Sequence, residues 1–263
     1  MKQAKVRLGA LALSSLRLNK LLLLLTGLAL LLVGMSYWAV NRLLMEEREK
    51  TEFHFARLIE SIHEHEDFLR IGAESYDHAS GNFSMDNKPR SHIELMRQDN
   101  EVLFQNRDTA KSLPFTVSQR DTFSLDDMQG VYSFGVQLTD LFTAYWSDSY
   151  YSAPQVFVFS PTAQFSIAVP GIDGTRQYPL LFKDNFFAVT KRLYDAFLPR
   201  RQALNSDQVL WMKAPLELIQ KRKYIVGAIK VNLPQRFMQA ANEGSSVILS
   251  ALLDVSDVSD LER

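Results

Sequence analysis

Residues 21–40 read LLLLLTGLALLLVGMSYWAV, a run of 20 residues without a charged side chain. A helix of that length rises about 30 Å, which matches the hydrocarbon core of a bilayer. A core helix of a soluble protein carries polar residues at helical spacing, but the polar side chains here are only Thr26, Ser36 and Tyr37. The run therefore predicts one transmembrane helix.

The charges on either side of this run predict its direction. The preceding residues 1–20 hold five basic residues and no acidic one, whereas acidic and basic residues alternate over 42–50. The positive-inside rule then places residues 1–20 in the cytoplasm and everything after Val40 outside. A cleaved signal peptide is disfavoured, because the apolar run is longer than a typical signal core and Ser36–Val40 is a poor cleavage site.

The composition limits the classes of function. The 29 Lys and Arg residues nearly balance the 30 Asp and Glu residues, so the formal net charge is −1 and bulk attraction to nucleic acid is not expected. The chain has no cysteine. This excludes thiol nucleophiles, cysteine-ligated zinc and iron–sulfur clusters.

Residues 41–72 are predicted to form one long amphipathic helix that leaves the membrane. Apolar residues recur by threes and fours along it, at Leu44, Phe55, Leu58, Ile62 and Leu69. The same seam includes Arg48, Thr51 and His65, so the pattern is not a regular coiled coil. Two interpretations stay open: a helix packed on its own domain, or a signalling stalk that pairs with a second subunit.

Residues 73–263 predict an α+β domain with an antiparallel sheet flanked by helices. Alternating or β-branched runs predict strands at 101–106, 115–118, 155–159, 164–169, 208–213, 224–232 and 245–255. Apolar residues at helical spacing predict helices at 124–146, 184–198 and 234–241. Residues 77–90 hold Gly81, Asn82, Asn87 and Pro89 and are predicted to be a loop.

Several stretches together resemble a known class of protein. They are Trp38–Phe68, Ala144–Ser149 with Val156–Ser160, and Leu210–Pro215 leading into Tyr224–Asn232. The arrangement resembles the periplasmic PDC/Cache-like sensor region of bacterial transmembrane receptors, most closely that of Rcs-type hybrid sensor histidine kinases. The second resemblance is to the sensor regions of gammaproteobacterial diguanylate cyclases.

The resemblance implies a fold, a location and partners. It implies a PDC/Cache-like domain in the periplasm, held in the bacterial inner membrane by a single pass and forming a homodimer. The protein would be the input region of a two-component system, and it would detect a small polar ligand or a periplasmic protein partner.

The sequence departs from such receptors in one respect. No second span, HAMP, kinase or cyclase segment follows, and residues 254–263 read DVSDVSDLER. We therefore expect the chain to be the N-terminal piece of a longer receptor. The alternative is a membrane-tethered binding or assembly protein of the envelope that has no output domain.

Catalytic motifs are absent from the sequence, which has no P-loop, GxSxG, HExxH or GGDEF motif. We assign no catalytic residue and no cofactor, and any enzymatic activity would belong to an output domain. The segment His63–Asp67, HEHED, suggests a metal site, but residues two apart on a helix face different ways. We therefore interpret it as a solvated helix surface and assign no metal ligand.

A ligand pocket on the sheet is the remaining candidate site. The resemblance implies aromatic walls with a few charged groups, which suits a small polar ligand. The candidate lining residues are Tyr145, Trp146, Asp148, Arg176, Tyr178, Lys183 and Trp211. In the alternative interpretation, Trp146 and Trp211 are core residues and Arg176 is a solvated loop charge.

Overall fold

The structure is a computed structural model that describes most of the chain. The chain divides into two compact units, residues 1–56 and 57–263. The described residues are 2–78, 92–98, 100–106, 113–120, 125–151, 153–160, 164–171, 186–200, 202–215, 223–232 and 246–255. For 2–17, 77–78, 92–98 and 125–127 only the backbone is described.

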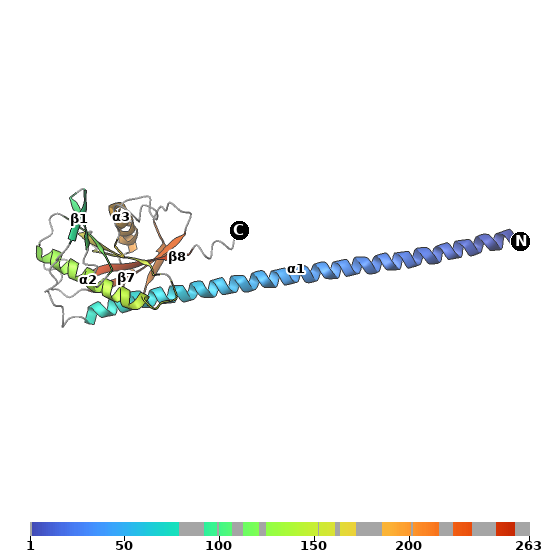
Figure 1. Cartoon of the computed structure of the whole chain (residues 1–263), viewed down its shortest axis with the longest axis horizontal. Helices are drawn as coiled ribbons and strands as arrows, with labels where there is room; N and C mark the ends of the chain where they lie inside the picture. The colour runs from blue at the N-terminus through green and yellow to red at the C-terminus, as the bar shows by residue number, and fades with distance from the viewer. Residues whose placement is uncertain are drawn as a thin grey trace. The chain divides into compact units, whose positions relative to one another are not determined.

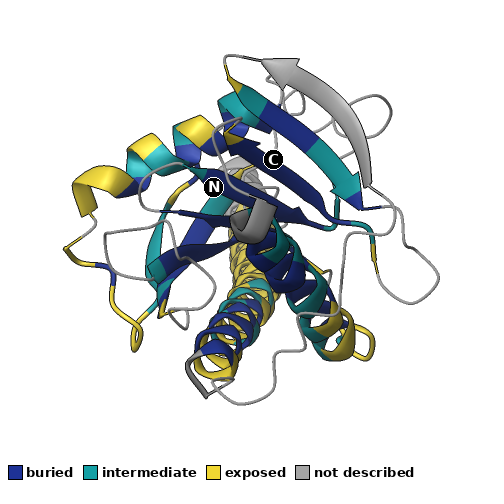
Figure 2. Ribbon diagram, turned by 90° about the vertical axis from the view of Figure 1, so that its left-hand side faces the viewer, coloured by how far each residue is buried: buried dark blue, intermediate teal, exposed yellow. Residues whose placement is uncertain are grey.

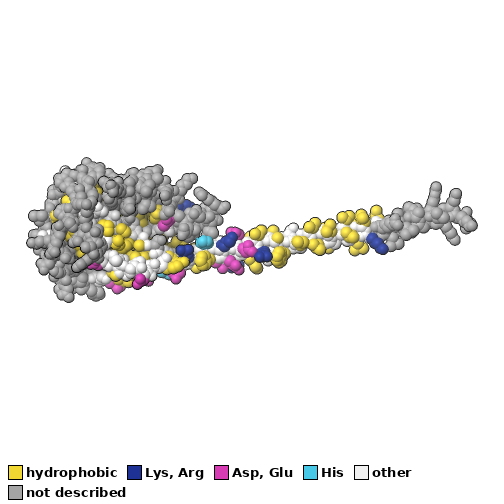
Figure 3. All heavy atoms as spheres, in the orientation of Figure 1, with side chains coloured by type: hydrophobic (Ala, Val, Ile, Leu, Met, Phe, Trp, Pro, Cys, Tyr) yellow, Lys and Arg dark blue, Asp and Glu magenta, His cyan; other side chains and the backbone are white. Residues whose placement is uncertain are grey.

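One helix, α1 (Lys2–His78), forms the whole of the described N-terminal region (Figure 1). It contains no proline, so no residue interrupts its backbone hydrogen bonds. Exposed ion pairs one turn apart add a few tenths of a kcal/mol each, for example between Arg48 and Glu52 at 2.8 Å. In the described part of the chain, α1 is the one helix long and apolar enough to span a membrane. Figure 3 shows its band of hydrophobic side chains bounded by charged ones.

The predicted helix 41–72 is present, and it is continuous with the apolar run before it. It also extends further than predicted, as far as His78. Asp77 and His78 were predicted to begin a loop, and that assignment is wrong. The remainder of the predicted loop falls almost wholly outside the described residues.

The second unit contains an eight-stranded sheet in the order β1-β2-β3-β5-β4-β8-β7-β6, and all of its pairings are antiparallel. The strands are β1 (His92–Gln98), β2 (Glu101–Asn106), β3 (Thr116–Arg120), β4 (Gln155–Phe159), β5 (Phe165–Val169), β6 (Leu210–Lys213), β7 (Tyr224–Asn232) and β8 (Ser246–Asp254). The helices are α2 (Leu125–Trp146), α3 (Phe186–Phe197) and the short 3-10 helix η1 (Leu198–Arg200). The predicted α+β class with an antiparallel sheet and flanking helices is confirmed.

Every predicted strand is present, with ends that differ by no more than two residues. The predicted hairpin of β4 and β5 pairs Val156 with Val169 and Phe159 with Ser166. The strand that the sequence did not predict is β1, which lies at one edge of the sheet and pairs with β2 alone. The predicted helix 234–241 lies outside the described residues.

The sheet is covered on both faces, which explains the continuous apolar runs in its strands (Figure 2). In β4, Val156 and Val158 point to the face covered by α1 and α2, and Phe157 points to the face covered by α3. Strand β8 alternates in the same way and lies between β4 and β7. The last strand among the described residues is thus an interior strand of the sheet.

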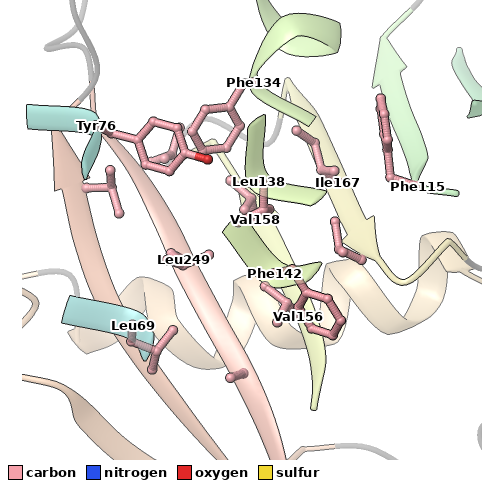
Figure 4. Close-up of a cluster of buried hydrophobic side chains, with 14 of the residues drawn as sticks. Leu69, Tyr76, Phe115, Phe134, Leu138, Phe142, Val156, Val158, Ile167 and Leu249 are labelled. Atoms are coloured by element: carbon pink, nitrogen blue, oxygen red, sulfur yellow. The ribbon is translucent and has the colours of Figure 1, made fainter. Parts of the chain in front are cut away.

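The C-terminal part of α1 belongs to this core. Phe68, Leu69, Ala73 and Tyr76 are buried there against α2 and the sheet. Figure 4 shows Leu69 and Tyr76 among side chains of α2 and of β8, with the ring of Tyr76 beside that of Phe134. Gly72 lets the helix approach β8 closely, because a Cβ there would lie 2.8 Å from Leu249 Cδ2.

We predict that Leu69→Ala destabilises the domain and that Ile71→Ala does so far less. Leu69 is 0% exposed and Ile71 is 39% exposed on the same helix. Removing the buried side chain should cost about 2–5 kcal/mol, against about 1 kcal/mol or less for the exposed one. Urea unfolding of the full chain in detergent, followed by tryptophan fluorescence, measures both. Equal costs would contradict the packing of α1 in this core.

Candidate functional site

Polar contacts join α1 to other elements of the second unit. Side chains from the end of α2, from the segment after it and from β6 hydrogen-bond to acidic residues of α1. We call this set the α1 clamp, and it consists of Glu60, Glu64, Glu66, Tyr145, Ser149, Tyr151 and Trp211.

On the α2 side, Glu64 accepts two hydrogen bonds. The hydroxyl of Tyr145 donates to its main-chain oxygen at 3.1 Å, and Ser149 Oγ donates to its Oε1 at 2.5 Å. One turn earlier, the hydroxyl of Tyr151 donates to Glu60 Oε2 at 2.7 Å. Since Glu60 and Glu64 are four residues apart, they share a face of the helix and meet the same neighbouring segment.

A hydrogen bond within the segment that follows α2 holds Ser149 in position to contact Glu64. Ser149 Oγ accepts the main-chain N–H of Tyr151 at 3.1 Å, so one hydroxyl joins the turn to Glu64. The guanidinium of Arg57 lies 5.6 Å from the ring centroid of Tyr150, which adds a contact to the previous turn of α1.

On the sheet side, the indole N–H of Trp211 donates to Glu66 Oε1 at 2.7 Å. Trp211 is in β6, where its register partner in β7 is Gly227. The ring lies over this glycine, since a Cβ at Gly227 would be 2.9 Å from Trp211 Cη2. The missing side chain therefore makes room for the ring that reaches α1.

Hydrogen bonding and burial keep the phenols of the clamp protonated. The hydrogen bond to Glu60 is the main reason that the pKa of Tyr151 rises to about 12. Burial, followed by the charges of Glu64 and Asp67, raises the pKa of Tyr145. Both phenols therefore act as hydrogen-bond donors at neutral pH, and the carboxylates act as acceptors.

A buried histidine lies next to the clamp. His65 is 1% exposed, and its Nδ1 lies 2.7 Å from the main-chain oxygen of Ser61. Its ring contacts that of Trp146, with centroids 4.9 Å apart. Burial lowers the pKa of His65, against smaller opposing effects of Ser61 and Glu64. The imidazole is therefore neutral at pH 7.

The interpretation of His63–Asp67 as a solvated surface is wrong for His65. His63 is exposed, but His65 faces the core because the buried face of α1 includes it. The two rings thus point in different directions, as expected from their spacing. Within the described ranges, no three His, Cys, Asp or Glu side chains are grouped so that they could hold a metal ion.

The structure brings together part of the predicted ligand site. Tyr145 and Trp146 are in ring contact at 5.2 Å, and Tyr145 and Trp211 hydrogen-bond to α1. Asp148 is exposed beside them, while Arg176, Tyr178 and Lys183 lie outside the described residues. The described aromatic residues hold α1, and the prediction that the set lines a ligand pocket stays a prediction.

Sequence reasoning missed the residues of the clamp other than Tyr145 and Trp211. The acidic residues Glu60, Glu64 and Glu66 look like an ordinary solvated helix surface in the sequence. Their partners are distant along the chain, since 85 residues separate Glu64 from Ser149 and 145 separate Glu66 from Trp211.

No protein-family model, curated protein or solved structure matches this chain.

We predict that the effect of Gly227→Ala depends on Trp211. An alanine in a strand is normally more stable than glycine by about 0.5–1 kcal/mol. Here the new Cβ displaces the Trp211 ring from Glu66, so we expect a net loss of about 1–2 kcal/mol. In a Trp211→Ala background the same substitution should be neutral or stabilising. Thermal unfolding of the four full-length chains measures this, and the same loss in both backgrounds would contradict it.

Proposed function

We propose that this chain is the extracytoplasmic signal-sensing region of a two-component receptor, a hybrid sensor histidine kinase of the bacterial inner membrane. The observation that carries the proposal is that a single helix, α1, includes both the apolar run and four core residues of the sheet domain. A change in how the domain holds Phe68–Tyr76 therefore acts directly on the helix that would cross the membrane.

The clamp supports this proposal physically. A signal shifts an equilibrium only if it binds one arrangement better than another. Hydrogen bonds from two separate elements, the segment after α2 and strand β6, meet α1 within two turns. A small polar ligand or a periplasmic protein that alters either element would change the hold on α1. In this proposal the PDC/Cache-like fold supplies the input domain.

A second copy of the chain is the partner that we propose for α1. Large apolar side chains beyond the apolar run are exposed in the first unit, namely Leu43, Leu44, Met45, Phe53 and Phe55. A patch of exposed apolar side chains marks an interaction site. A homodimer would bury those that share one face of the helix, such as Leu44 and Phe55, and give the signal a second helix against which to move.

Two other functions remain as outcomes of a test. Sequencing the gene beyond the codon for Arg263 distinguishes them. A second span followed by a kinase domain supports the proposal, and a cyclase domain makes the chain the sensor region of a diguanylate cyclase. A stop codon would indicate a membrane-tethered envelope protein for binding or assembly.

We predict that the N-terminus is cytoplasmic and the sheet domain is external. The chain has no cysteine, so each introduced cysteine is the sole thiol. Exposed Ser206 is a suitable external position, and Ser14 is in the basic segment. A membrane-impermeant maleimide should label Ser206→Cys in intact cells and Ser14→Cys only after lysis. Labelling in the opposite order would refute the topology.

We also predict that the clamp controls the pairing of α1. Single cysteines at residues 43–56 should form disulfide-linked dimers with helical periodicity in native membranes. Glu64→Ala removes the acceptor of Ser149, so it should change the cross-linking yield at Phe55→Cys at least twofold. Glu74→Ala, at an exposed position of α1, is the control and should leave the yield unchanged. Absence of dimers at every position, or equal yields in both variants, would count against signalling through α1.

A further inference from the structure

His65 is a titratable group buried at the point where α1 enters the core. Along α1 from its N-terminus, Ser61 and His65 are the first two buried positions with described side chains. The preceding turn is exposed or half-buried, and Phe68 and Leu69 follow in the apolar core. A charge on His65 would therefore appear at the boundary between the solvated and the buried part of the helix.

The hydrogen bond to Ser61 fixes the tautomer of the neutral ring. A main-chain oxygen can only accept, so Nδ1 carries the proton that is shared with Ser61 O. In the neutral ring, Nε2 is then unprotonated. Among the described residues, the buried indole N–H of Trp146 has no hydrogen-bond partner, and its ring packs on that of His65. The interface of α1 and α2 thus buries polar groups without satisfying all of them.

The surroundings of His65 offer little to stabilise a positive charge. On α1, the carboxylate of Glu64 acts on it, but this side chain is half-buried and already accepts from Ser149. On α2, the facing groups are Trp146 and Tyr145, and Tyr145 is a neutral phenol that donates to the main chain of Glu64. Burial has the largest effect on the pKa of His65 and lowers it.

We propose that His65 is a proton switch in the hold on α1. In this inference, acidification places a charge on the imidazole between α1 and α2, and the packing of α1 at the clamp loosens so that water can reach the ring. The ligand is the proton itself. The switch rests on the proposed function only in the last step, from loosened packing to a signal, because the ring titrates whether or not the chain is a sensor.

The direction of the pH dependence follows from the lowered pKa. An unfolded or loosened chain takes up the proton at the ordinary histidine pKa near 6.5, and the packed form resists it. Stability is therefore constant above about pH 6.5 and falls as the pH drops below that value, with up to a tenfold change in the unfolding equilibrium per pH unit.

The test compares two histidines on the same helix, in the full chain in nanodiscs of zwitterionic lipid. His65→Asn keeps an N–H donor near the position of Nδ1 and removes the titration, and His63→Asn changes an exposed ring. Between pH 6.5 and 5 the native chain should lose about 2–4 °C in melting temperature per pH unit. His63→Asn should show the same slope, and His65→Asn should be nearly flat. An unchanged slope in His65→Asn would overturn the inference.

A second measurement uses the native chain alone. NMR of histidine labelled at Cε1, with the His65 resonance assigned from its contact with the ring of Trp146, gives the pKa of His65. That pKa should lie below the ordinary histidine value near 6.5, and amide exchange of Ser61–Phe68 should accelerate as His65 is protonated. A pKa of His65 at or above the ordinary value refutes the switch. If the topology or cross-linking experiments contradict their predictions while the pKa of His65 is lowered as expected, the sensor proposal alone is refuted.

Discussion

The burial of one face of α1 against the sheet is the contact on which the rest of the structure depends. Phe68, Leu69 and Tyr76 are almost fully buried, and each contributes about 1.5–3 kcal/mol relative to exposure. The same helix is exposed all round over its apolar run. A single unbroken helix thus has apolar side chains on every side along its apolar run, and on one side only where it packs against the sheet. Gly72 supports this packing, because its missing side chain lets α1 come close to Leu249.

The hydrogen bonds of the clamp fix the orientation of α1 more than they add to the free energy of unfolding. A hydrogen bond to a carboxylate contributes about 1.5–3 kcal/mol when buried, and less at an exposed site such as Glu60. Packing alone would tolerate small rotations of α1, since apolar contacts have little directionality. The bonds of Ser149 and Trp211 to Glu64 and Glu66 have defined geometry and come from two separate elements. Together they select one rotation of the helix about its axis.

The sequence predicted the elements well because runs of β-branched and aromatic residues indicate strands even where both faces are covered, as in Val156–Phe159. It missed β1, whose residues HIELMRQ show no strong alternation, and it ended α1 before His78 because glycine and asparagine further on suggested an early loop. The candidate site was harder. Tyr145 and Trp211 were found because aromatic residues are conspicuous, but their partners on α1 look like solvated acidic residues. Contacts that span 145 residues, such as Trp211 with Glu66, leave no local pattern.

The position of His65 places polar groups where α1 enters the core. Most of the core is apolar, yet the first buried positions of α1 are Ser61 and His65. His65 packs on Trp146 of α2, whose indole N–H has no hydrogen-bond partner among the described residues. Apolar residues at these places would hold α1 more firmly, because unsatisfied buried polar groups cost about 1–3 kcal/mol each. Elements that move are drawn from the least stable parts of a fold. In the proposed switch, protonation of His65 would loosen α1 near its point of entry while Phe68 and the residues that follow it stay packed in the core and the domain stays folded.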